Sequence, residues 1–587
     1  MQNPDIARLF EEVADLLEIQ GANPFRVRAY RNAARTILDL PDPLAEAVLE
    51  AADLTTIPGI GDDLADKIAT IVRTGGLPLH RQLVKQLSPG VLDLLRIPGL
   101  GPKRVKLLRS KLKVKSAADL AKALDAGRVA KLPGFGAKMV EKVRAGLGRA
   151  ARAERRLLLP EAETHARAIV EWLEAGGGIE RIAVAGSYRR RRETVGDLDV
   201  LVTTGSPNPV IERFTRYEDV RQVQSAGETR ATVTLRGGLQ LDLRVVEPAA
   251  YGAALLYFTG SKAHNVELRQ LALDHGYKLN EYGLFKGARR VAGATEEDVY
   301  AKLKLAWIPP ELREARGEIA LAARRALPRL VELADVRGDV QMHSDASDGV
   351  ATVREMAEAA RRLGYGYVAI TDHSKRVSMS GLDAQALRAH WKAIDRLNAG
   401  ADGFRILKSV EMDILESGTL DLPDDVLAEA DYVVATIHYG LTQTERQLTD
   451  RLLGAIANRW VDAIGHPTGR ILNKRDPYPL DFDAVARAAA ESGCFLELNG
   501  SERMDLPDSL AAAAKQLGCR FVLSTDAHDP KHLPHMRYAV DLARRAGLSA
   551  DDVANTREVD GFLRMLRRNR EPGAGSPKGL AGARREP

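Results

Sequence analysis

The C-terminal part of the chain, from about residue 336, repeats one pattern: a short apolar run, a potential metal ligand at its end, and a stretch with helical spacing. Seven such runs lie near 339–343, 367–371, 405–411, 432–438, 461–466, 494–497 and 520–525. Strands that alternate with helices favour parallel pairing, and this number of strands favours a barrel. Because the carboxyl ends of barrel strands meet at one mouth, the pattern predicts a distorted (β/α)7 barrel with its ligands gathered there.

Eight residues at or near these strand ends are predicted metal ligands. The chain has only two cysteines, and both lie inside apolar runs, so histidines and carboxylates make up the set. A lone histidine is usually structural, but five histidines with acids at equivalent positions favour a cluster. Such ligands suit zinc, manganese or iron. These predicted ligands are His343, Asp348, His373, Glu411, His438, His466, Asp526 and His528.

Four motifs in this region, at 347–349, 370–374, 465–467 and 524–528, resemble the polymerase and histidinol phosphatase (PHP) domain. The resemblance implies a trinuclear site, holding Zn²⁺ and/or Mn²⁺, that hydrolyses phosphoesters. The resemblance also implies a ninth ligand, Gln341, which departs from the family pattern because it stands in place of the first histidine of the opening His-x-His motif. An amide oxygen is a poorer zinc ligand than imidazole, so one metal position is expected to be weak or to favour manganese. A structural, inactive barrel is the alternative, and a nucleotide or pyrophosphate hydrolase is another.

The middle of the chain carries three acids in strand-like runs. Asp197 and Asp199 are two residues apart, so alternation along a strand places both on one face. Asp242 lies in a Leu-Asp-Leu run that points it away from its apolar neighbours. Alone, an Asp-x-Asp pair is more often an exposed strand end. Three such acids together suit two Mg²⁺ or Mn²⁺ ions that activate a hydroxyl and hold a triphosphate.

The segments GSYRR at 186–190 and GDLD at 196–199 resemble the signature of family X DNA polymerases, and 257–261 and 279–283 resemble its nucleotide-binding and thumb segments. The resemblance implies that the three aspartates are catalytic metal ligands, with Asp242 accepting the primer hydroxyl proton. Lys262 stands where animal members carry an acid, so we expect an additional cation beside the nucleotide. The implied nucleotide-binding residues are Gly186, Ser187, Arg190, Tyr257, Phe258, Gly260, Lys262, Asn265 and Arg269.

The first 150 residues contain three Pro-Gly-x-Gly turns, at 57–61, 97–101 and 132–136, each followed by a helix-like stretch. Glycines permit a tight turn, and the N-terminus of the next helix offers N–H groups to an anion. Three turns at similar spacing resemble helix-hairpin-helix motifs, which bind the DNA backbone without reading sequence. The predicted DNA-binding glycines are Gly59, Gly61, Gly99, Gly101, Gly134 and Gly136.

The N-terminal region also resembles the lyase domain of family X, through NPFR at 23–26, AYR at 29–31 and Lys67. A lysine at this position can form a Schiff base with a 5′-deoxyribose phosphate. Asp63 and Asn32 stand where animal members have lysines. A purely DNA-binding role is therefore the alternative for this region.

The whole pattern predicts a multidomain α and α/β protein related to bacterial and archaeal family X polymerases with a PHP domain. The expected function is template-directed gap filling in base excision repair, with 3′→5′ exonuclease activity and cleavage at abasic sites. The expected partners are gapped or primed double-stranded DNA and dNTPs. A template-independent nucleotidyltransferase is the rival enzyme. The predicted divisions are 1–85 lyase-like, 86–160 fingers, 161–248 nucleotidyltransferase palm, 249–312 thumb, 313–335 linker, 336–570 PHP domain and 571–587 disordered tail.

Composition restricts the setting of this function. The chain is 45% hydrophobic and 28% charged, and it contains neither a long apolar run nor a secretory signal pattern. We therefore expect a cytoplasmic protein without a membrane partner. The sequence does not indicate the oligomeric state, so a monomer is the default expectation. The formal net charge of +5 is too small to indicate nucleic-acid binding by itself.

Overall fold

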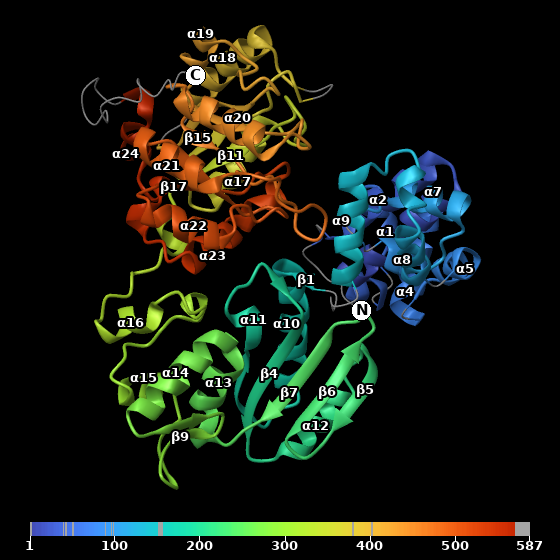
Figure 1. Cartoon of the computed structure of the whole chain (residues 1–587), viewed down its shortest axis with the longest axis vertical. Helices are drawn as coiled ribbons and strands as arrows, with labels where there is room; N and C mark the ends of the chain where they lie inside the picture. Colours follow the sequence, from blue (N-terminus) through green and yellow to red (C-terminus); the bar gives the residue numbers. More distant parts are fainter. Residues whose placement is uncertain are drawn as a thin grey trace. The chain divides into compact units, whose positions relative to one another are not determined.

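The computed structural model describes residues 3–38, 40, 44–49, 52–74, 76–88, 90–95, 97, 99–150, 156–377, 381–400 and 403–569. The chain forms two compact units, Met1–Ala315 and Arg316–Pro587 (Figure 1). The first unit contains a helical region, a five-stranded sheet and a small three-stranded sheet, and the second contains a seven-stranded parallel sheet. The predicted disordered tail, 571–587, lies outside the described residues.

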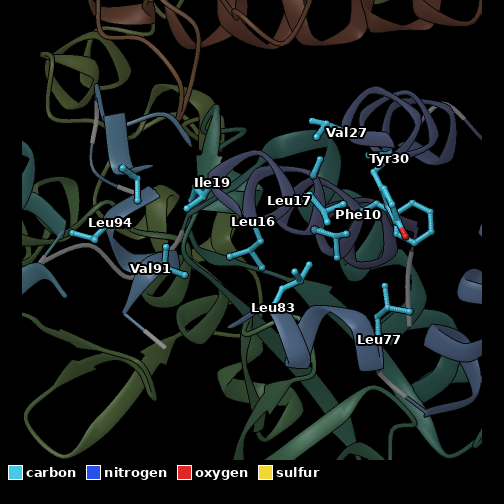
Figure 2. Close-up of a cluster of buried hydrophobic side chains, with 14 of the residues drawn as sticks. Phe10, Leu16, Leu17, Ile19, Val27, Tyr30, Leu77, Leu83, Val91 and Leu94 are labelled. Atoms are coloured by element: carbon cyan, nitrogen blue, oxygen red, sulfur yellow. The ribbon is translucent and has the colours of Figure 1, made fainter. Parts of the chain in front are cut away.

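A helical region begins the first unit, and apolar residues at helical spacing form its core. In Figure 2, Phe10 and Leu17 of the first helix lie near Val27 and Tyr30 of the second. The ring centroids of Phe10 and Tyr30 are 5.5 Å apart. The helices are α1 (Asn3–Gln20), α2 (Pro24–Leu38), α3 (Leu44–Leu49), α4 (Asp62–Thr74), α5 (Pro78–Leu87), α6 (Val91–Leu95), α7 (Pro102–Leu112), α8 (Ala117–Asp125) and α9 (Ala137–Ala150).

The three predicted turns share one backbone form and lead into α4, α7 and α9. The first glycines, Gly59, Gly99 and Gly134, have φ angles of +81°, +92° and +78°, a region that favours glycine. The apolar residue between the two glycines is buried in each turn. The carbonyl of the second glycine accepts N–H bonds from the first turn of the helix. The helix-hairpin-helix prediction is therefore confirmed at the level of the fold.

The five-stranded sheet, or palm, has the strand order β2-β4-β7-β6-β5, in which β4 and β7 are parallel and the other pairs are antiparallel. Helices α10 (Leu159–Glu174) and α12 (Pro207–Thr215) pack against it. Strand β5 was not predicted, because its side chains are mostly exposed and lack apolar alternation. The strands are β2 (Ile179–Val184), β4 (Asp197–Thr204), β5 (Val220–Ala226), β6 (Arg230–Leu235) and β7 (Gln240–Val245).

Shorter elements complete the first unit. A two-stranded pair, β1 (Leu157–Leu158) and β3 (Thr194–Val195), lies on either side of the short helix α11 (Gly186–Arg189) in the sequence. The thumb contains two helices, a three-stranded antiparallel sheet and a third helix. Its elements are α13 (Tyr251–Thr259), α14 (Lys262–Asp274), β8 (Lys278–Asn280), β9 (Gly283–Lys286), β10 (Arg289–Ala292) and α15 (Glu296–Lys302).

The second unit is a seven-stranded parallel barrel whose strands follow one another in sequence order, as predicted. A parallel bridge between Met342 and Ala527 brings the first strand beside the end of the last, so the barrel is nearly closed. Both cysteines are buried and unpaired. The strands are β11 (Gly338–Met342), β12 (Tyr367–Ile370), β13 (Arg405–Asp413), β14 (Tyr432–Thr436), β15 (Ala463–Ile464), β16 (Phe495–Asn499) and β17 (Phe521–Ser524).

Helix α24 (Val559–Met565) covers the amino end of this barrel. The Phe562 ring lies 5.4 Å from that of Tyr367, 5.6 Å from Tyr432 and 6.4 Å from Phe495, centroid to centroid. These three residues begin β12, β14 and β16. The amino end is therefore filled by aromatic packing, and the opposite end is the mouth that the predicted ligands surround. No helix of the described residues has the length and apolar character needed to span a membrane.

Candidate active sites

The palm brings the three predicted aspartates together. Asp197 and Asp199 lie on one face of β4, and Asp242 of β7 is the register partner of Asp199. Burial and the charges of Asp197 and Asp242 raise the pKa of Asp199 to about 7. Asp242 accepts hydrogen bonds from Thr232 (2.6 Å) and Gln240 (2.8 Å). Because neighbouring carboxylates repel one another, the cluster is suited to binding cations.

Gly186 allows α11 to approach these carboxylates. Its φ is +66°, and a side chain there would begin 2.7 Å from Oδ2 of Asp199. Any other residue would collide with the carboxylate and strain the backbone. The sequence motif thus places a glycine where the helix must lie against the acidic cluster.

A cavity of about 640 Å³ opens beside the aspartates. All nine predicted nucleotide-binding residues line it, together with Asp197 and Asp199. Thr259, which belongs to the predicted segment 257–261, also lines it, as do Arg156 and Arg192, which were not predicted to bind the nucleotide. The five cationic side chains in this lining suit a polyanion such as a triphosphate. The cations are Arg156, Arg190, Arg192, Lys262 and Arg269.

The two unpredicted arginines reach the cavity for different reasons. Arg192 belongs to the same arginine run as the signature motif, so its position in the sequence was a usable signal. Arg156 precedes β1, and its guanidinium donates to Oγ1 (3.0 Å) and the backbone carbonyl (2.6 Å) of Thr194 in β3. Pairing of β1 with β3 brings this side chain to the cavity, and nothing in the local sequence indicates that contact.

Hydrogen bonds hold several cavity residues in place. Nε of Arg190 donates to Glu314 at 3.1 Å, and its Nη1 donates to the carbonyl of Thr259. The Asn265 amide donates to the carbonyl of Tyr257 at 2.7 Å, which ties α14 to α13. The cavity wall is therefore formed before any ligand arrives, which lowers the cost of ordering it on binding.

A buried ion network joins the palm to the thumb. Glu296 accepts paired hydrogen bonds from Arg189 (2.7 and 2.9 Å) and from Arg313 (2.7 and 3.0 Å). Arg189 also donates to Thr259 at 2.8 Å, and Trp307 donates to Glu296 at 3.0 Å. Burial opposes ionisation of Glu296, but the two arginines outweigh it and lower its pKa to about 2. This network positions the α13 to α14 turn that lines the cavity.

The barrel mouth gathers the predicted histidine and carboxylate ligands around Glu411. Its carboxylate oxygens lie 3.3 Å from His343, 3.2 Å from His373, 3.4 Å from His438 and 3.0 Å from His466, measured to ring nitrogens. Two ligands of one metal ion are typically about 3 Å apart, given bonds of about 2.1 Å. Burial raises the pKa of Glu411, but the histidines outweigh it and hold that pKa well below its usual range.

Asp348 and Asp526 complete two further groups at the mouth. Asp348 lies 3.3 Å from His373 and 3.4 Å from His528, and Asp526 lies 3.2 Å from His343. Contacts thus link eight of the nine predicted ligands into one cluster, and seven of these fall in three overlapping groups with metal-site spacing. Buried ring nitrogens of His343, His373 and His466 lack hydrogen-bond partners, which fits side chains that would ligate metal ions.

Residues beside the ligands hold them in position. Glu497 accepts hydrogen bonds from Ser524 and from the backbone N–H of His466, so it supports a ligand and is outside the metal-spaced groups found among the described residues. Asp372 likewise accepts from Ser344 at 2.8 Å. His466 and Asp526 have φ angles of +29° and +52°. Strain of this kind in non-glycine residues is typical of functional sites.

Gln341 lies in β11, two residues before His343 and therefore on the same face of the strand. Its side chain is 1% exposed, and neither its amide oxygen nor its nitrogen has a hydrogen-bond partner. The oxygen lies near Gly465, the residue before His466. A buried amide group without hydrogen-bond partners is costly. A cation bound to the amide oxygen would satisfy that oxygen.

In the helical region, Lys67 of α4 is close to Asp63 of the same helix. Its ammonium group donates to the Asp63 carboxylate and to the Asp63 carbonyl at 3.1 Å. The Lys67 side chain is only 17% exposed, whereas that of Asp63 is 80% exposed. A Schiff base at Lys67 therefore requires that the contact with Asp63 is first broken.

Four protein families match successive parts of the chain. They are the helix-hairpin-helix domain (residues 1–77), the SAM-like helix-hairpin-helix tandem (91–149), the DNA polymerase beta thumb (254–314) and the PHP domain (339–501). Their order follows the structural order of the helical region, the thumb and the barrel.

Comparison with individual proteins covers the chain as a whole. The chain is 38% identical over 575 residues to the DNA polymerase/3′-5′ exonuclease PolX of Bacillus subtilis. The match covers 97% of this chain and 100% of that protein. The chain is also 32% identical over 247 residues to a probable phosphatase of Caldanaerobacter subterraneus, a match that covers 40% of this chain and 92% of that protein. Similarity of this extent, together with the palm aspartates and the barrel ligands, places the chain among the family X DNA polymerases that carry a C-terminal PHP domain.

Proposed function

We propose that the first unit performs template-directed DNA synthesis with two divalent cations, Mg²⁺ or Mn²⁺, held by Asp197, Asp199 and Asp242. The observation that carries this proposal is the cavity in which Asp197 and Asp199 adjoin five cationic side chains. Bound cations would favour loss of the 3′-hydroxyl proton and neutralise the triphosphate. No base-specific group is needed from the protein, because the template base selects the nucleotide.

The residues of this chain have separate tasks in that reaction. Asp242 accepts the hydroxyl proton of the primer and is oriented by Thr232 and Gln240. Ser187 and Arg190 bind the outer phosphates, and Tyr257 to Gly260 lie against the incoming sugar. Asn265 and Arg269 lie beside the nascent base pair, and Lys262 adds a cation that faces the nucleotide. Positioned donors of this kind stabilise charge as it develops.

The proposed substrate is gapped or primed double-stranded DNA with dNTPs, and the proposed role is gap filling in base excision repair. The three turns with a shared backbone form support backbone binding, because Gly61, Gly101 and Gly136 have open space beside them. A template-independent nucleotidyltransferase is the rival. Primer extension opposite each of the four template bases separates the two, since the rival adds nucleotides without regard to the template.

We propose that the barrel is a metal-dependent phosphoesterase that shortens DNA from its 3′ end and cleaves at abasic sites, with Zn²⁺ and/or Mn²⁺ bound by the nine predicted ligands. The metal-site spacing of seven ligands and the contact of His466 with Glu411 support this proposal, and the buried amide of Gln341, which lacks hydrogen-bond partners, supports the ninth ligand. Bound metal ions would supply a hydroxide and polarise the phosphate. A structural barrel without catalysis is the alternative.

A labelled primer tests the barrel activity directly. A 5′-labelled primer in a gapped duplex is incubated with Mn²⁺ and no nucleotides, with wild-type protein and with His343→Ala. We expect stepwise shortening by the wild type and none by the variant. Asp197→Ala serves as a matched control, because it removes a palm ligand and leaves the barrel intact. If neither protein shortens the primer while extension with dNTPs is normal, the barrel is structural or acts on another phosphoester.

Three further assignments are also proposals. Lys67 acts as a lyase nucleophile once Asp63 is displaced, with a purely DNA-binding role as the alternative. Reduction with borohydride in the presence of 5′-deoxyribose-phosphate DNA would trap the adduct, and Lys67→Ala should abolish it.

The protein works as a cytoplasmic monomer. The divisions at about 85, 160, 248, 312 and 335 separate the lyase-like, fingers, palm, thumb, linker and PHP segments.

A further inference from the structure

Three residues from distant segments of the first unit form a buried cluster outside both candidate active sites. Asp5 lies in the first turn of α1, His165 lies in α10, and Asp219 stands directly before β5. Each of the three residues is 1% exposed. One ligand atom from each residue, a ring nitrogen or a carboxylate oxygen, lies within 4.8 Å of the other two, which is the spacing that the barrel groups also show.

The local structure brings each of these side chains to the cluster. His165 lies on the buried face of α10. The carbonyl of Asp219 accepts a hydrogen bond from the N–H of Arg236 at 2.8 Å, which ties Asp219 to the turn between β6 and β7. Asp5 can approach that turn because Gly237 has no side chain, since a Cβ there would collide with Oδ1 of Asp5. The close approach of α1 to the palm is therefore built into the fold.

The contact between Asp5 and His165 is too long for a hydrogen bond. Oδ2 of Asp5 lies 3.7 Å from Nε2 of His165, whereas N–H···O bonds have lengths of about 2.7–3.2 Å. The separation is closer to the roughly 3.0–3.4 Å between two ligands of one ion, given bonds of about 2.1 Å. Neither Oδ2 of Asp5 nor Nδ1 of His165 has a hydrogen-bond partner. Arg8 donates to Oδ1 of Asp5 at 3.0 Å, so Oδ2 is the oxygen that faces the cluster.

A buried carboxylate oxygen without a hydrogen-bond partner is costly, and a cation bound among the three side chains would offset that cost. One imidazole and two carboxylates suit Zn²⁺ or Mn²⁺. We propose that Asp5, His165 and Asp219 bind one divalent metal ion that fixes the start of α1 to the palm. The role of this ion is structural, because binding to the folded chain stabilises it. The site is separate from the proposed polymerase and phosphoesterase centres, since its residues belong neither to the cavity lining nor to the barrel.

Hydrogen exchange in the full-length protein tests the site at α1 itself. Protein stripped of metal by a chelator is compared with the same protein after addition of Zn²⁺, and mass spectrometry follows exchange in peptides from α1 and α10. We expect Zn²⁺ to slow amide exchange in α1 by about tenfold or more, because the ion joins that helix to α10 and to the segment before β5. Peptides from the barrel report separately on the barrel metal ions. Unchanged exchange in α1 would overturn the proposal.

Zinc content per chain gives a second, independent measurement. His165→Gln removes the imidazole but keeps a polar side chain, and Asp5→Asn replaces a carboxylate with an amide of the same shape. After dialysis against a competing chelator, each variant should retain about one zinc ion fewer per chain than the wild type. Exchange in α1 of each variant should no longer respond to Zn²⁺.

His80→Gln is the matched control and should retain as much zinc as the wild type. His80 pairs with Glu12 at 2.8 Å in the same unit, and this pair has no third ligand at metal-site spacing among the described residues. Zinc retention equal to that of the wild type in both His165→Gln and Asp5→Asn would overturn the proposal. The exchange measurement on the wild type needs no substitution, so it decides the question even where a variant does not fold. Neither measurement depends on polymerase or exonuclease activity, so failure of this site would leave the proposed functions untouched.

Discussion

In the palm, three carboxylates adjoin one another with no histidine between them, whereas the barrel surrounds Glu411 with four histidines. Burial and like charges raise the pKa of Asp199 to about 7. The histidines instead hold the pKa of Glu411 below its usual range, against the effect of burial. The histidines thus favour the charged form of the Glu411 carboxylate, whereas the palm carboxylates oppose one another's charge. The two proposed metal sites therefore differ in what their own side chains do to a carboxylate charge.

The largest expected effect comes from removing the central palm charge. Asp199→Asn should reduce nucleotide incorporation by about a thousandfold or more, because a lost metal ligand costs several kcal/mol at the transition state. In the absence of metal ions, the Asp199→Asn variant should be at least as stable as the wild type, because the substitution removes a carboxylate that its neighbours repel. Single-turnover extension and thermal unfolding in a chelator measure the two quantities. A fall in stability comparable to that of a barrel-ligand variant would contradict the contrast between the sites.

Removing a charge from the buried ion network around Glu296 should instead lower the stability of the protein. Glu296→Gln leaves Arg313 buried beside a neutral group and should lower the free energy of unfolding by about 3 kcal/mol at pH 7. Because the pKa of Glu296 is lowered to about 2 from an ordinary 4.5, its stabilisation is complete above pH 4.5 and is lost as the pH falls towards 2. Urea unfolding at pH 7 and at pH 4 measures this.

Glu247→Gln is the control for that experiment, since Glu247 pairs with Arg290 and its side chain is 74% exposed. It should change stability by less than about 1 kcal/mol. The difference in the free energy of unfolding between the wild type and Glu296→Gln should shrink as the pH falls. A difference that grows would show that the pKa of Glu296 is not lowered.

The barrel's departure from its family pattern offers a sharper test of metal binding. Gln341→His supplies an imidazole in place of an amide and should raise the affinity for zinc at one position by about tenfold or more. Zinc content per chain after dialysis against a competing chelator is the measurement. Gln385→His, an exposed substitution on α18 (Ala384–Asn398), is the control. Equal zinc retention by Gln341→His and wild type would place Gln341 outside the metal centre.

The smallest expected effect lies on the nucleotide side of the palm. Lys262 lines the cavity, and Lys262→Ala should weaken binding of a dNTP by about tenfold through loss of one charged contact. Lys286→Ala, exposed at the end of β9, should have no effect. Equilibrium titration with a non-hydrolysable dNTP gives both affinities. An unchanged affinity in Lys262→Ala would remove this lysine from the nucleotide site.

The sequence by itself determined the features that follow from regular spacing. Alternation along strands placed Asp197 and Asp199 on one face, and parallel strands with ligands at their ends indicated the barrel and its mouth. The helix-hairpin-helix turns could be read directly, because glycine spacing is a local property of the backbone. The domain divisions and the individual nucleotide-binding roles stay predictions.

Only the tertiary structure decided which charges meet across long separations. Arg156 reaches the nucleotide cavity through the pairing of β1 with β3, and Glu296 joins two arginines from distant segments. The contact of Phe562 in α24 with Tyr367 in β12 likewise joins segments that are far apart in the sequence. Periodic spacing fixes which side chains share a face, but contacts between loops depend on how the whole chain closes, which no local pattern of residues records.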